Sequence, residues 1–445
     1  MSWLAPAILF LLYLNAPAVA VRIHGAPFLL AALVPLALAI PVAHQVLVRG
    51  EPLRFPNILL AAVVMLLLHS ISALTSVRPY EAMDSLQTWL LEGVLLALLI
   101  SNAIRTRTDV RWAAVAIVAA GAVMGGLAIL QQISGATDQN FFGFAQLDAT
   151  ISDTSGRLQR RLAGPIGETN RFAQIMAVLI PIAAGLALTS KGRERVLFWL
   201  ATGLIAGGMT FAFSRGAIVA LGLALPFAVI FRMVRVRHLA IAVALSICVL
   251  AALPHYAERV LSIGQVAMQS IGVGPVGLRN ADGASRGRLT EMKAAGMLFM
   301  EYPVLGAGPG LAPHYYAHYA GLVGGKVRAD QRRSHNLFLQ LAAETGFIGL
   351  AAFLTVVGLT FRSLERARRR LERSDRPLWG VICGLELALI ISLTTSLFLH
   401  AAYIRYFWIL LGLSAAATAH HGAPVLATLL ERMFRQMAER IRADA

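Results

Sequence analysis

Long apolar runs recur along this 445-residue chain, and they restrict its possible folds more than any other feature. A helix that crosses a bilayer needs about 20 apolar residues, because each residue adds only about 1.5 Å to its length. Charged residues make up 14% of the chain, whereas soluble domains carry about 25%, so a soluble enzyme is excluded. The sequence predicts an all-α polytopic membrane protein with about twelve transmembrane helices, in the runs 3–20, 28–48, 57–75, 85–104, 112–133, 172–189, 196–213, 216–231, 238–254, 337–361, 378–399 and 403–419.

Two alternating sets of short loops differ in their content of Lys and Arg. One set carries 18 basic residues, in the loops 49–56, 102–111, 190–195, 231–238 and 362–377. The other set carries 4, in the loops 21–27, 76–84, 214–216 and 400–405. Because cytoplasmic loops hold the basic excess in membrane proteins, we expect the first set and both termini to be cytoplasmic. The long outer loops 134–171 and 255–336 hold another 13 basic residues that anchoring does not require.

The apolar pattern divides the chain into four parts. These are transmembrane helices 1 to 9 with the first long outer loop (1–254), a large, partly helical periplasmic loop (255–336), transmembrane helices 10 to 12 (337–419) and a cytoplasmic amphipathic tail (420–445). Apolar residues at helical spacing among arginines predict an interfacial helix in the tail. A short packing helix is the alternative for that segment.

Four polar clusters in the outer segments form the candidate site. They are Arg160-Arg161 with Glu168, Asn170 and Arg171; Ser214-Arg215-Gly216; Arg286-Gly287-Arg288; and Arg332-Arg333-Ser334-His335-Asn336. If the helices pack as a bundle, all four clusters should reach the same interface. The turn that holds Arg215 is so short that this cation lies at the membrane boundary, where an unpaired charge is costly.

Arginine side chains are suited to binding a lipid-linked diphosphate. A guanidinium stays protonated and can hold two phosphate oxygens at once, and each charge-assisted hydrogen bond contributes about 1.5–3 kcal/mol. The same charges would stabilise a diphosphate as it leaves. We assign this binding to Arg160, Arg161, Arg215, Arg288 and Asn170, with support from Arg286, Arg333 and Asn336. The alternative is that the outer arginines pair with lipid headgroups or with Glu168, Asp282, Glu291 and Asp330.

His335 is the candidate base. Its ordinary pKa of about 6.5 lets it accept a proton near neutral pH. It stands at an expected helix start, with Ser334 as the expected N-cap. A helix N-terminus disfavours the imidazolium and attracts anions, so the position suits a neutral base beside a phosphate. A structural role for this interfacial histidine is the alternative.

Four further features of the sequence carry predictions. The Gly-x-Gly-x-Gly stretch 306–310 follows no expected strand, so we interpret it as a turn and not as a nucleotide site. Glu386 lies in the middle of an apolar run, where it serves either a function or a helix–helix hydrogen bond. His314 and His318 have no glutamate between them, so we predict no metal site there. Four tyrosines could stack on sugars or form an interfacial belt: Tyr302, Tyr315, Tyr316 and Tyr319.

Segments around the candidate base resemble a known superfamily. The stretches 334–340 (SHNLFLQ) and 344–350 (ETGFIGL) resemble the signature of the O-antigen ligase and polymerase superfamily. The segment 288–310 is similar to that family's segment before the signature, and Ser214-Arg215-Gly216 is similar to its short outer arginine turn. Residues 161–170 resemble its outer segment before the sixth span, so the resemblance covers mainly 160–360.

The resemblance implies a multi-pass glycosyltransferase of the bacterial inner membrane whose active site faces the periplasm. Ligases of this family transfer O-antigen from undecaprenyl diphosphate to lipid A-core in lipopolysaccharide biosynthesis. The family's essential arginines and histidine correspond to Arg215, Arg288 and His335. Its members work without a metal or other cofactor, so the implied partners are the lipid-linked glycan, lipid A-core and membrane lipids, and no nucleic acid. No carboxylate is clearly placed as a nucleophile, so we expect inversion.

The sequence leaves three alternative hypotheses for the function. An O-antigen polymerase of the same superfamily would carry the same motifs. A flippase or transporter of lipid-linked glycans would place charges or broken helices near the middle of the membrane, but most arginines lie outside the expected spans. A scaffolding protein would leave the outer arginine clusters without an explanation.

Overall fold

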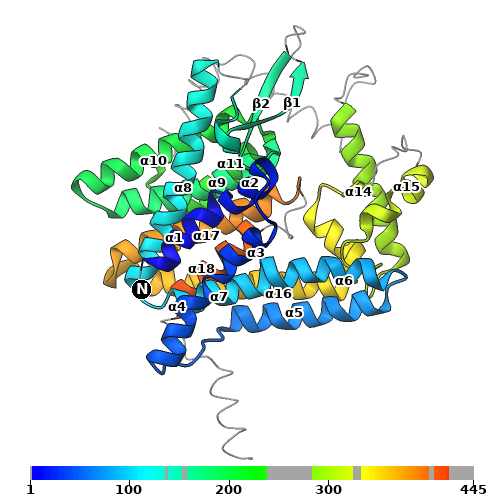
Figure 1. Ribbon diagram of the computed structural model, residues 1–445, viewed down its shortest axis with the longest axis horizontal. Coiled ribbons are helices and arrows are strands. Elements are labelled where there is room, and N and C mark those ends of the chain that lie inside the picture. Colours follow the sequence, from blue (N-terminus) through cyan, green and yellow to red (C-terminus); the bar gives the residue numbers. More distant parts are fainter. Residues whose placement is uncertain are drawn as a thin grey trace, which may run out of the picture.

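The computed structural model describes residues 3–135, 139–152, 158–237, 283–323, 332–399 and 405–419, which form a helical bundle with one β-hairpin (Figure 1). Before the hairpin lie α1 Leu4–Tyr13, α2 Ala16–His24, α3 Leu29–Leu36, α4 Ala39–Ala43, η1 His44–Val48, α5 Asn57–Thr75, α6 Pro79–Thr88, η2 Trp89–Val94, α7 Leu95–Ala103, α8 Arg107–Ser134 and the short turn η3 Phe141–Gly143. The hairpin strands are β1 Gln146–Ser152 and β2 Leu158–Gly164. After it lie α9 Thr169–Thr189, α10 Gly192–Phe211, α11 Arg215–Ile230, α14 Gly283–Glu301, α15 Ala312–Leu322, α16 Leu337–Ser374, α17 Arg376–Thr395 and α18 Arg405–Thr418.

Within the part of the chain that the structure describes, seven helical stretches are long and apolar enough to cross a membrane, or eight if the bent pair α1–α2 counts as one span. They are Leu29–Val48, Asn57–Thr75, Pro79–Ala103, Arg107–Ser134, Thr169–Thr189, Leu337–Ser374 and Arg376–Thr395. The axes of α1 and α2 differ by 49°. The prediction of a multi-pass helical protein is confirmed. The number twelve stays a prediction, and the expected span 238–254 and the tail 420–445 lie outside the described residues.

Two segments that we expected to be loops are helical. Helix α6 begins at Pro79, inside the expected loop 76–84, and α16 continues to Ser374 through the expected loop 362–377. In the second case Leu364, Ala367 and Leu371 are buried, so the apolar stripe continues along one face although six arginines share this part of the helix. Charge composition therefore concealed an amphipathic helix end.

The centre of the bundle is the packing of α9 against α17. The two backbones meet at Gly185 and Gly380, where a Cβ on either residue would collide with the other's carbonyl. Small residues allow this close approach between membrane helices. Nearby, the rings of Trp89 and Trp408 meet edge to face at 5.7 Å, which ties η2 to α18. This packed frame holds the outer segments described next.

A β-hairpin that was not expected from the sequence occupies part of the outer segment 134–171. Strands β1 and β2 are antiparallel, with Asp148 opposite Arg161. Oδ2 of Asp148 accepts hydrogen bonds from the backbone N–H and the hydroxyl of Thr169, at 3.1 and 2.8 Å. The hairpin is thereby fastened to the first turn of α9, which fixes where Arg161 stands.

Helix α16 is broken at Gly346, whose φ of 64° and ψ of −170° only glycine adopts readily. The break leaves backbone groups without helical partners, and the segment 303–308 supplies them. The N–H groups of Ala307 and Gly308 donate to the carbonyls of Ala343 and Glu344 at 3.0 and 2.9 Å, and Phe347 donates to Pro303 at 2.8 Å. The interpretation of the glycine-rich stretch as a turn is confirmed, and this turn docks onto a membrane helix.

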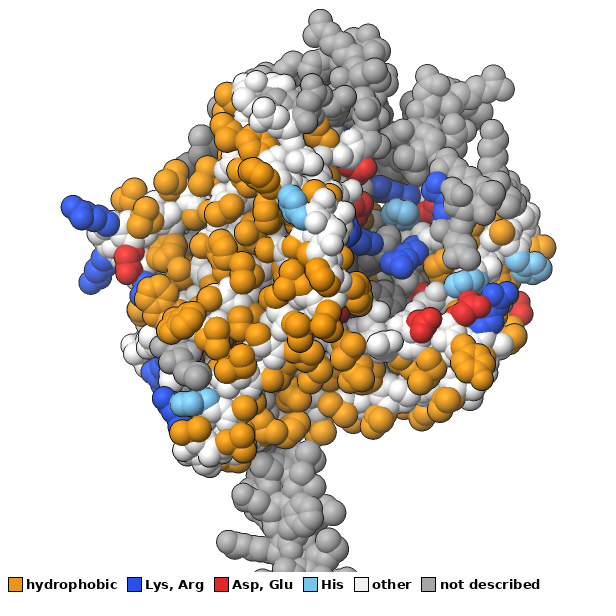
Figure 2. Space-filling view, in the orientation of Figure 1, with side chains coloured by type: hydrophobic (Ala, Val, Ile, Leu, Met, Phe, Trp, Pro, Cys, Tyr) orange, Lys and Arg blue, Asp and Glu red, His pale blue; other side chains and the backbone are white. Residues whose placement is uncertain are grey.

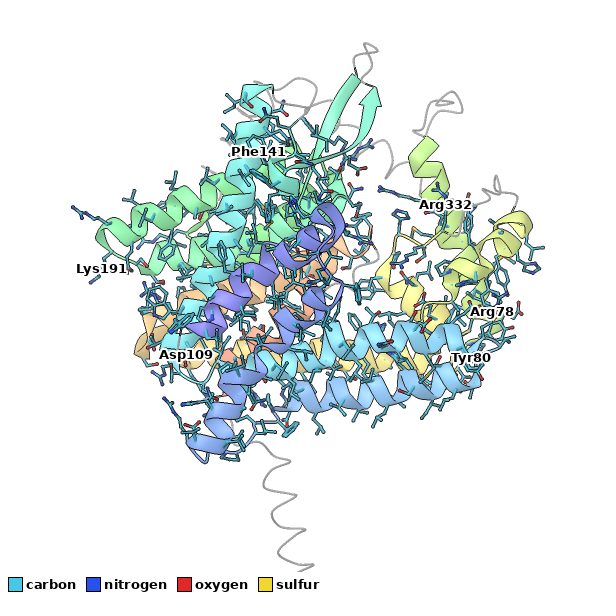
Figure 3. All side chains as sticks on the ribbon, viewed as in Figure 1. Arg78, Tyr80, Asp109, Phe141, Lys191 and Arg332 are labelled. Carbon is cyan, nitrogen blue, oxygen red and sulfur yellow. The ribbon has the colours of Figure 1, made fainter. Side chains whose placement is uncertain are left out.

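The expected inner and outer segments lie at opposite sides of the molecule. Figure 3 shows Lys191 and Asp109, from two expected cytoplasmic loops, on the left of the bundle. Phe141, Arg332 and Arg78, from three expected outer segments, lie at the top and right. Between these sides, the face of the molecule that Figure 2 shows is largely hydrophobic. On this face the bundle has polar segments at both sides and an apolar surface between them.

Candidate active site

The turn between α10 and α11 is held by Arg161. Its Nε and Nη2 donate to the carbonyl of Ala212 at 3.1 and 2.9 Å, and Nη2 also donates to Oδ1 of Asn170 at 3.2 Å. A cation suits this position because the last carbonyls of α10 carry partial negative charge. Oδ1 of Asn170 also accepts from the Ser214 hydroxyl at 3.4 Å. Two of the predicted clusters are thus joined, and Arg215 follows as the first residue of α11.

Arg288 faces the same place from α14. A small cavity has as its lining Asn170, Ser214, Gly216, Ala217, Arg288, Thr395, Phe398 and Leu399. Arg288 is half-buried and, within the described part of the chain, makes no hydrogen bond or ion pair. Because Oδ1 of Asn170 is already an acceptor, its Nδ2 is the group that can donate into the cavity. The cavity therefore offers donors and positive charge, which suits an anion.

His335 is bound to Glu291, one turn of α14 beyond Arg288. Nδ1 of His335 lies 2.8 Å from Oε2 of Glu291 and 3.1 Å from the carbonyl oxygen of Arg333. The other carboxylate oxygen accepts from Arg332 at 3.1 Å. The Glu291 side chain is only 1% exposed. Arg288 and Glu291 are three residues apart, so α14 presents both from one side.

The partners of His335 fix its tautomer. Both oxygens that face Nδ1 are acceptors, so Nδ1 carries the hydrogen and, in the neutral ring, Nε2 carries the lone pair. Burial on its own would raise the pKa of Glu291, but the hydrogen bonds from His335 and Arg332 outweigh it and hold that pKa below its usual value. Glu291 is therefore a carboxylate, and it orients an imidazole whose Nε2 can accept a proton.

The backbone at His335 is strained, and the helix start differs from the prediction. His335 has a φ of 44°, a left-handed conformation that costs a non-glycine residue about 1–3 kcal/mol. The expected N-cap, Ser334, is wrong. Asn336 caps α16 by accepting from the N–H of Leu339 at 3.0 Å, while the Ser334 hydroxyl donates to the carbonyl of Asn336. The Asn336 side chain can reach the N–H of Leu339 in the first turn, because Asn336 directly precedes α16.

The remaining predicted site residues divide into three groups. Arg332 pairs with Glu291, as the alternative of outer ion pairs expected, and Arg171 pairs with Glu168 at 3.1 Å. Arg333 is exposed. The side chains of Arg160 and Arg286 lie outside the described residues.

The four tyrosines pack mainly between α14 and α15. Tyr316 and Tyr319 are both 4% exposed, so neither can stack on a sugar or form a membrane belt. Burial raises the pKa of Tyr319, and the hydrogen bond that its hydroxyl donates to Glu301 at 2.5 Å raises it further. The rings of Tyr302 and Tyr315 are 6.4 Å apart. This cluster supports α14 from behind.

Two other candidates have structural partners. Nε2 of His314 lies 3.0 Å from Glu81 and joins α15 to α6. Glu386 accepts from Nε of Arg368 at 3.0 Å, so the helix–helix bond between α16 and α17 accounts for it. Among the residues that the structure describes, no three His, Cys, Asp or Glu side chains gather as a metal site would require.

The bond between Glu291 and His335 was not predicted from the sequence. Glu291 was expected only as a possible partner of the outer arginines. The helical spacing of α14 could have identified it, because it shares a side with Arg288. Figure 2 shows the result in space: basic, acidic and histidine side chains gather in a hollow beside the hydrophobic face of the bundle.

The fold and this hollow define a class of protein: a multi-pass helical membrane protein with a cationic cavity and a carboxylate–histidine pair at one polar end. Residues 200–354 match the family described as O-Antigen ligase. This match supports an assignment to the O-antigen ligase family, and the matched stretch includes Arg215, Arg288, Glu291 and His335. No curated protein shows a significant match to the chain.

Proposed function

We propose that this protein is an O-antigen ligase that transfers a glycan from undecaprenyl diphosphate to a sugar of lipid A-core. One observation carries the proposal. Arg288 is half-buried without an ion pair among the described residues and lines a cavity with Asn170 and Ser214. A cation in that position is costly unless an anionic ligand completes it.

Arg288, Arg215 and Nδ2 of Asn170 bind the diphosphate in this proposal. Arg161 serves mainly as a positioning residue, because its guanidinium is bound to the α10–α11 turn and to Asn170. As the bond between the sugar and the diphosphate breaks, negative charge grows on the leaving oxygen. Arginines already aimed at that oxygen stabilise the transition state more than the ground state.

His335 acts as the general base in the transfer. Its Nε2 takes the proton of an acceptor hydroxyl while the hydroxyl oxygen attacks the anomeric carbon. The new glycosidic bond forms as the old carbon–oxygen bond breaks, and its electron pair leaves with the diphosphate. Attack opposite the leaving group inverts the anomeric centre. Glu291 stabilises the imidazolium that forms, as a carboxylate does behind other catalytic histidines.

The site faces the periplasm of the bacterial inner membrane in this proposal. The support is the separation seen in Figure 3: Asp109 and Lys191, from two of the basic short loops, lie on the side of the bundle opposite Arg332. Since cytoplasmic loops hold the basic excess, the arginine cavity belongs at the outer leaflet, where it meets a translocated lipid-linked glycan.

Transfer with purified components tests the proposal. The protein in lipid nanodiscs receives a polyprenyl-diphosphate glycan and lipid A-core, with a chelator present. We expect a product on the core oligosaccharide from the parent and from the Arg366→Ala control, whose arginine is exposed on the far part of α16. Loss of transfer in Arg288→Ala alone supports the site, and absence of product from the parent overturns the function.

The cell's lipopolysaccharide separates ligase from polymerase. Deletion of a ligase leaves polymerised O-antigen on its carrier lipid and bare lipid A-core. Deletion of a polymerase leaves lipid A-core with a single repeat. The second pattern would contradict the proposed ligase activity.

A further inference from the structure

The end of helix α17, residues 395–399, contacts both halves of the candidate active site. Thr395 is the last residue of α17 and lines the cationic cavity. The next residue, Ser396, caps the helix, and its carbonyl accepts a hydrogen bond from the N–H of Leu337 at 2.9 Å. Leu337 begins α16 two positions after His335. One short segment therefore contacts the cavity and the helix start beside the proposed base.

The hydrogen bond between Ser396 and Leu337 joins two helix ends of opposite polarity. The last carbonyls of a helix carry partial negative charge, while its first N–H groups carry partial positive charge and lack partners within the helix. Both residues are 1% exposed, so water cannot replace this bond. Because a buried N–H without a partner is costly, the start of α16 should follow any shift of the α17 end.

Gln174 fixes the α17 end from the side of α9. Its side chain is buried, and its Nε2 donates to Oγ1 of Thr395 at 2.6 Å. The same nitrogen also donates to the carbonyl of Ser392 at 3.3 Å. A carbonyl can only accept, so the amide nitrogen of Gln174 faces α17 and its oxygen does not. The Thr395 hydroxyl donates back to its own helix, which leaves its lone pairs to accept from Gln174.

The position of Gln174 on α9 links it to the cavity. It follows Asn170 by four residues, about one helical turn, so α9 presents both from one side. Asn170 lines the cavity, and Gln174 bonds the residue that forms the opposite wall, Thr395. Farther along, Gly185 and Gly380 already hold α9 and α17 in close contact. Gln174 therefore acts locally on the α17 end and is not needed to hold the two helices together.

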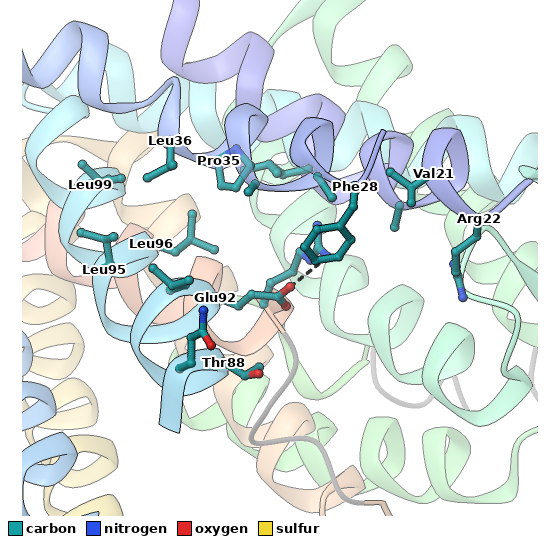
Figure 4. Close-up of a pocket in the computed structure, with 17 residues that line it drawn as sticks. Val21, Arg22, Phe28, Pro35, Leu36, Thr88, Glu92, Leu95, Leu96 and Leu99 are labelled. Atoms are coloured by element: carbon teal, nitrogen blue, oxygen red, sulfur yellow. Dashed lines mark hydrogen bonds and ion pairs between the residues drawn. The ribbon is translucent and has the colours of Figure 1, made fainter. Parts of the chain in front are cut away.

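The start of α18 is fixed separately. Arg405 begins this helix, and its Nη2 lies 3.5 Å from Glu92. Both residues line an apolar groove that α2 and α3 also line, and a dashed line at Glu92 in Figure 4 marks their ion pair. Phe398 and Leu399, which precede Arg405 in the chain, line the cationic cavity. The ion pair thus fixes α18, and Gln174 fixes the segment that adjoins the cavity.

We propose that Gln174 is a positioning residue of the transfer reaction, because it places the α17 end and thereby sets His335 relative to the Arg288 cavity. The proposal rests on the proposed function for the reaction itself. In-line attack requires the base and the leaving diphosphate on opposite sides of one anomeric carbon. A misplacement of about 1 Å can cost about 100-fold in rate. A displaced base beside an intact cavity lowers kcat and leaves the KM for the donor unchanged.

Kinetics of four variants test the position of the base. Gln174→Leu removes the donor, and we expect kcat to fall about tenfold while the KM for the donor stays within twofold. Thr395→Val removes the acceptor and should act alike, whereas Thr395→Ser, which keeps the hydroxyl, should recover most of the rate. Gln174→Leu combined with Thr395→Val should be no slower than either variant alone, because both remove one interaction.

The matched control is Thr394→Val. The Thr394 hydroxyl donates to the carbonyl of Ile390 on its own helix at 2.8 Å, so this variant should keep the parental rate. A raised KM at unchanged kcat in Gln174→Leu would place its effect on donor binding and overturn the proposal. Additive losses in the double variant would do the same. If Gln174→Leu does not fold, Thr395→Val and Thr395→Ser carry the comparison.

Hydrogen exchange tests the link without any glycan transfer. Deuterium uptake at the Leu337 N–H is measured by mass spectrometry with fragmentation, in the full protein in nanodiscs without substrate. We expect Gln174→Leu and Thr395→Val to accelerate this exchange at least fivefold, and Thr394→Val to leave it unchanged. Unchanged exchange in the first two variants would overturn the proposal, as would an equal acceleration along all of α17.

The two measurements keep the proposals apart. Accelerated exchange in a protein whose parent transfers no glycan contradicts the ligase function and leaves Gln174 as the residue that joins the two helix ends. Glycan transfer by the parent, with unchanged kcat and unchanged exchange in Gln174→Leu, contradicts the positioning role and leaves the function standing.

Discussion

Helix α16 has a charged cluster near each end, and the two clusters differ in how their arginines are balanced. Near its C-terminal end, Arg368 is bound by two carboxylates: Glu386 at 3.0 Å, and Glu365 on its own helix. Beside its N-terminal end, one carboxylate, Glu291, serves both Arg332 and His335, while Arg288 makes no ion pair among the described residues.

The difference separates a structural charge from a functional one. The Arg368 cluster is complete within the protein, so it holds α16 to α17 and offers nothing to a ligand. The outer cluster has more cations than carboxylates, and the excess charge faces a cavity. A half-buried cation without an ion pair is costly at a membrane boundary, and an anionic substrate would offset that cost when it binds.

Removing the proposed base, His335, from the outer cluster should lower activity more than any other substitution. We expect His335→Ala to lower kcat by about 10²–10⁴-fold, the usual contribution of a general base, with little change in binding of the donor. Single-turnover transfer with radiolabelled donor measures this, and retention of the same donor by the purified variant checks binding. A variant that transfers at the parental rate would exclude His335 as the base.

Breaking the inner cluster should affect stability and not chemistry. Glu386→Ala leaves Arg368 with only Glu365, and removing one partner of a buried ion pair costs about 3–5 kcal/mol. The melting temperature in detergent should fall, while turnover per folded molecule stays within twofold of the parent. Glu386→Leu combined with Arg368→Met, which removes both charges, should restore most of the stability. If the folded Glu386→Ala protein lost turnover, the Arg368 cluster would not be purely structural.

Replacing Arg288 by alanine should lower activity and leave stability unchanged. Arg288→Ala removes one or two charge-assisted hydrogen bonds of about 1.5–3 kcal/mol each, so kcat/KM should fall about 10- to 150-fold per bond lost. The melting temperature should not fall, because the charge has no partner to lose. Arg288→Lys keeps the charge but not the planar fork and should recover only part of the rate. If the Arg288 variant lost stability but kept its rate, Arg288 would have a structural role like that of Arg368.

The smallest effect should come from Glu291→Gln. The amide oxygen can still accept from Nδ1 of His335 but carries no charge, so we expect kcat to fall about tenfold. The pKa of Glu291 is lowered by folding, so its contribution to stability is present above its unfolded pKa of about 4.3 and is lost as pH falls through the lower, folded value. The gap in melting temperature between parent and variant should therefore be constant near neutral pH and should narrow below about pH 4. If the difference in melting temperature widened on acidification, Glu291 would not be an ionised partner of His335.

The expected apolar runs and the arginine turn could be predicted because they depend on local rules. A bilayer requires long apolar helices, and a turn as short as 214–216 leaves Arg215 no other place than the boundary. Most of the described spans lie where hydropathy predicts them. The short loop before α11 and the helix start after His335 follow from the same local signals.

The rest depends on contacts between distant residues. Glu291 and His335 are 44 positions apart, and no spacing rule joins them. The β-hairpin and the use of Arg161 to hold the α10–α11 turn depend on how α9 and α10 are placed. The break at Gly346 was hidden because it lies inside the mostly apolar run 337–361, and the docking of 303–308 supplies partners for the backbone groups at the break.

That docked break has a consequence for how the protein is assembled. Residues 303–308 leave the ribosome before their backbone partners at 343–347, and those partners belong to a helix that must first enter the membrane. The outer segment therefore cannot finish folding until α16 has been inserted. For the same reason, a soluble fragment limited to 255–336 would lack the surface that shapes the turn at 303–308, and antibodies raised against it would not recognise this turn in the intact protein.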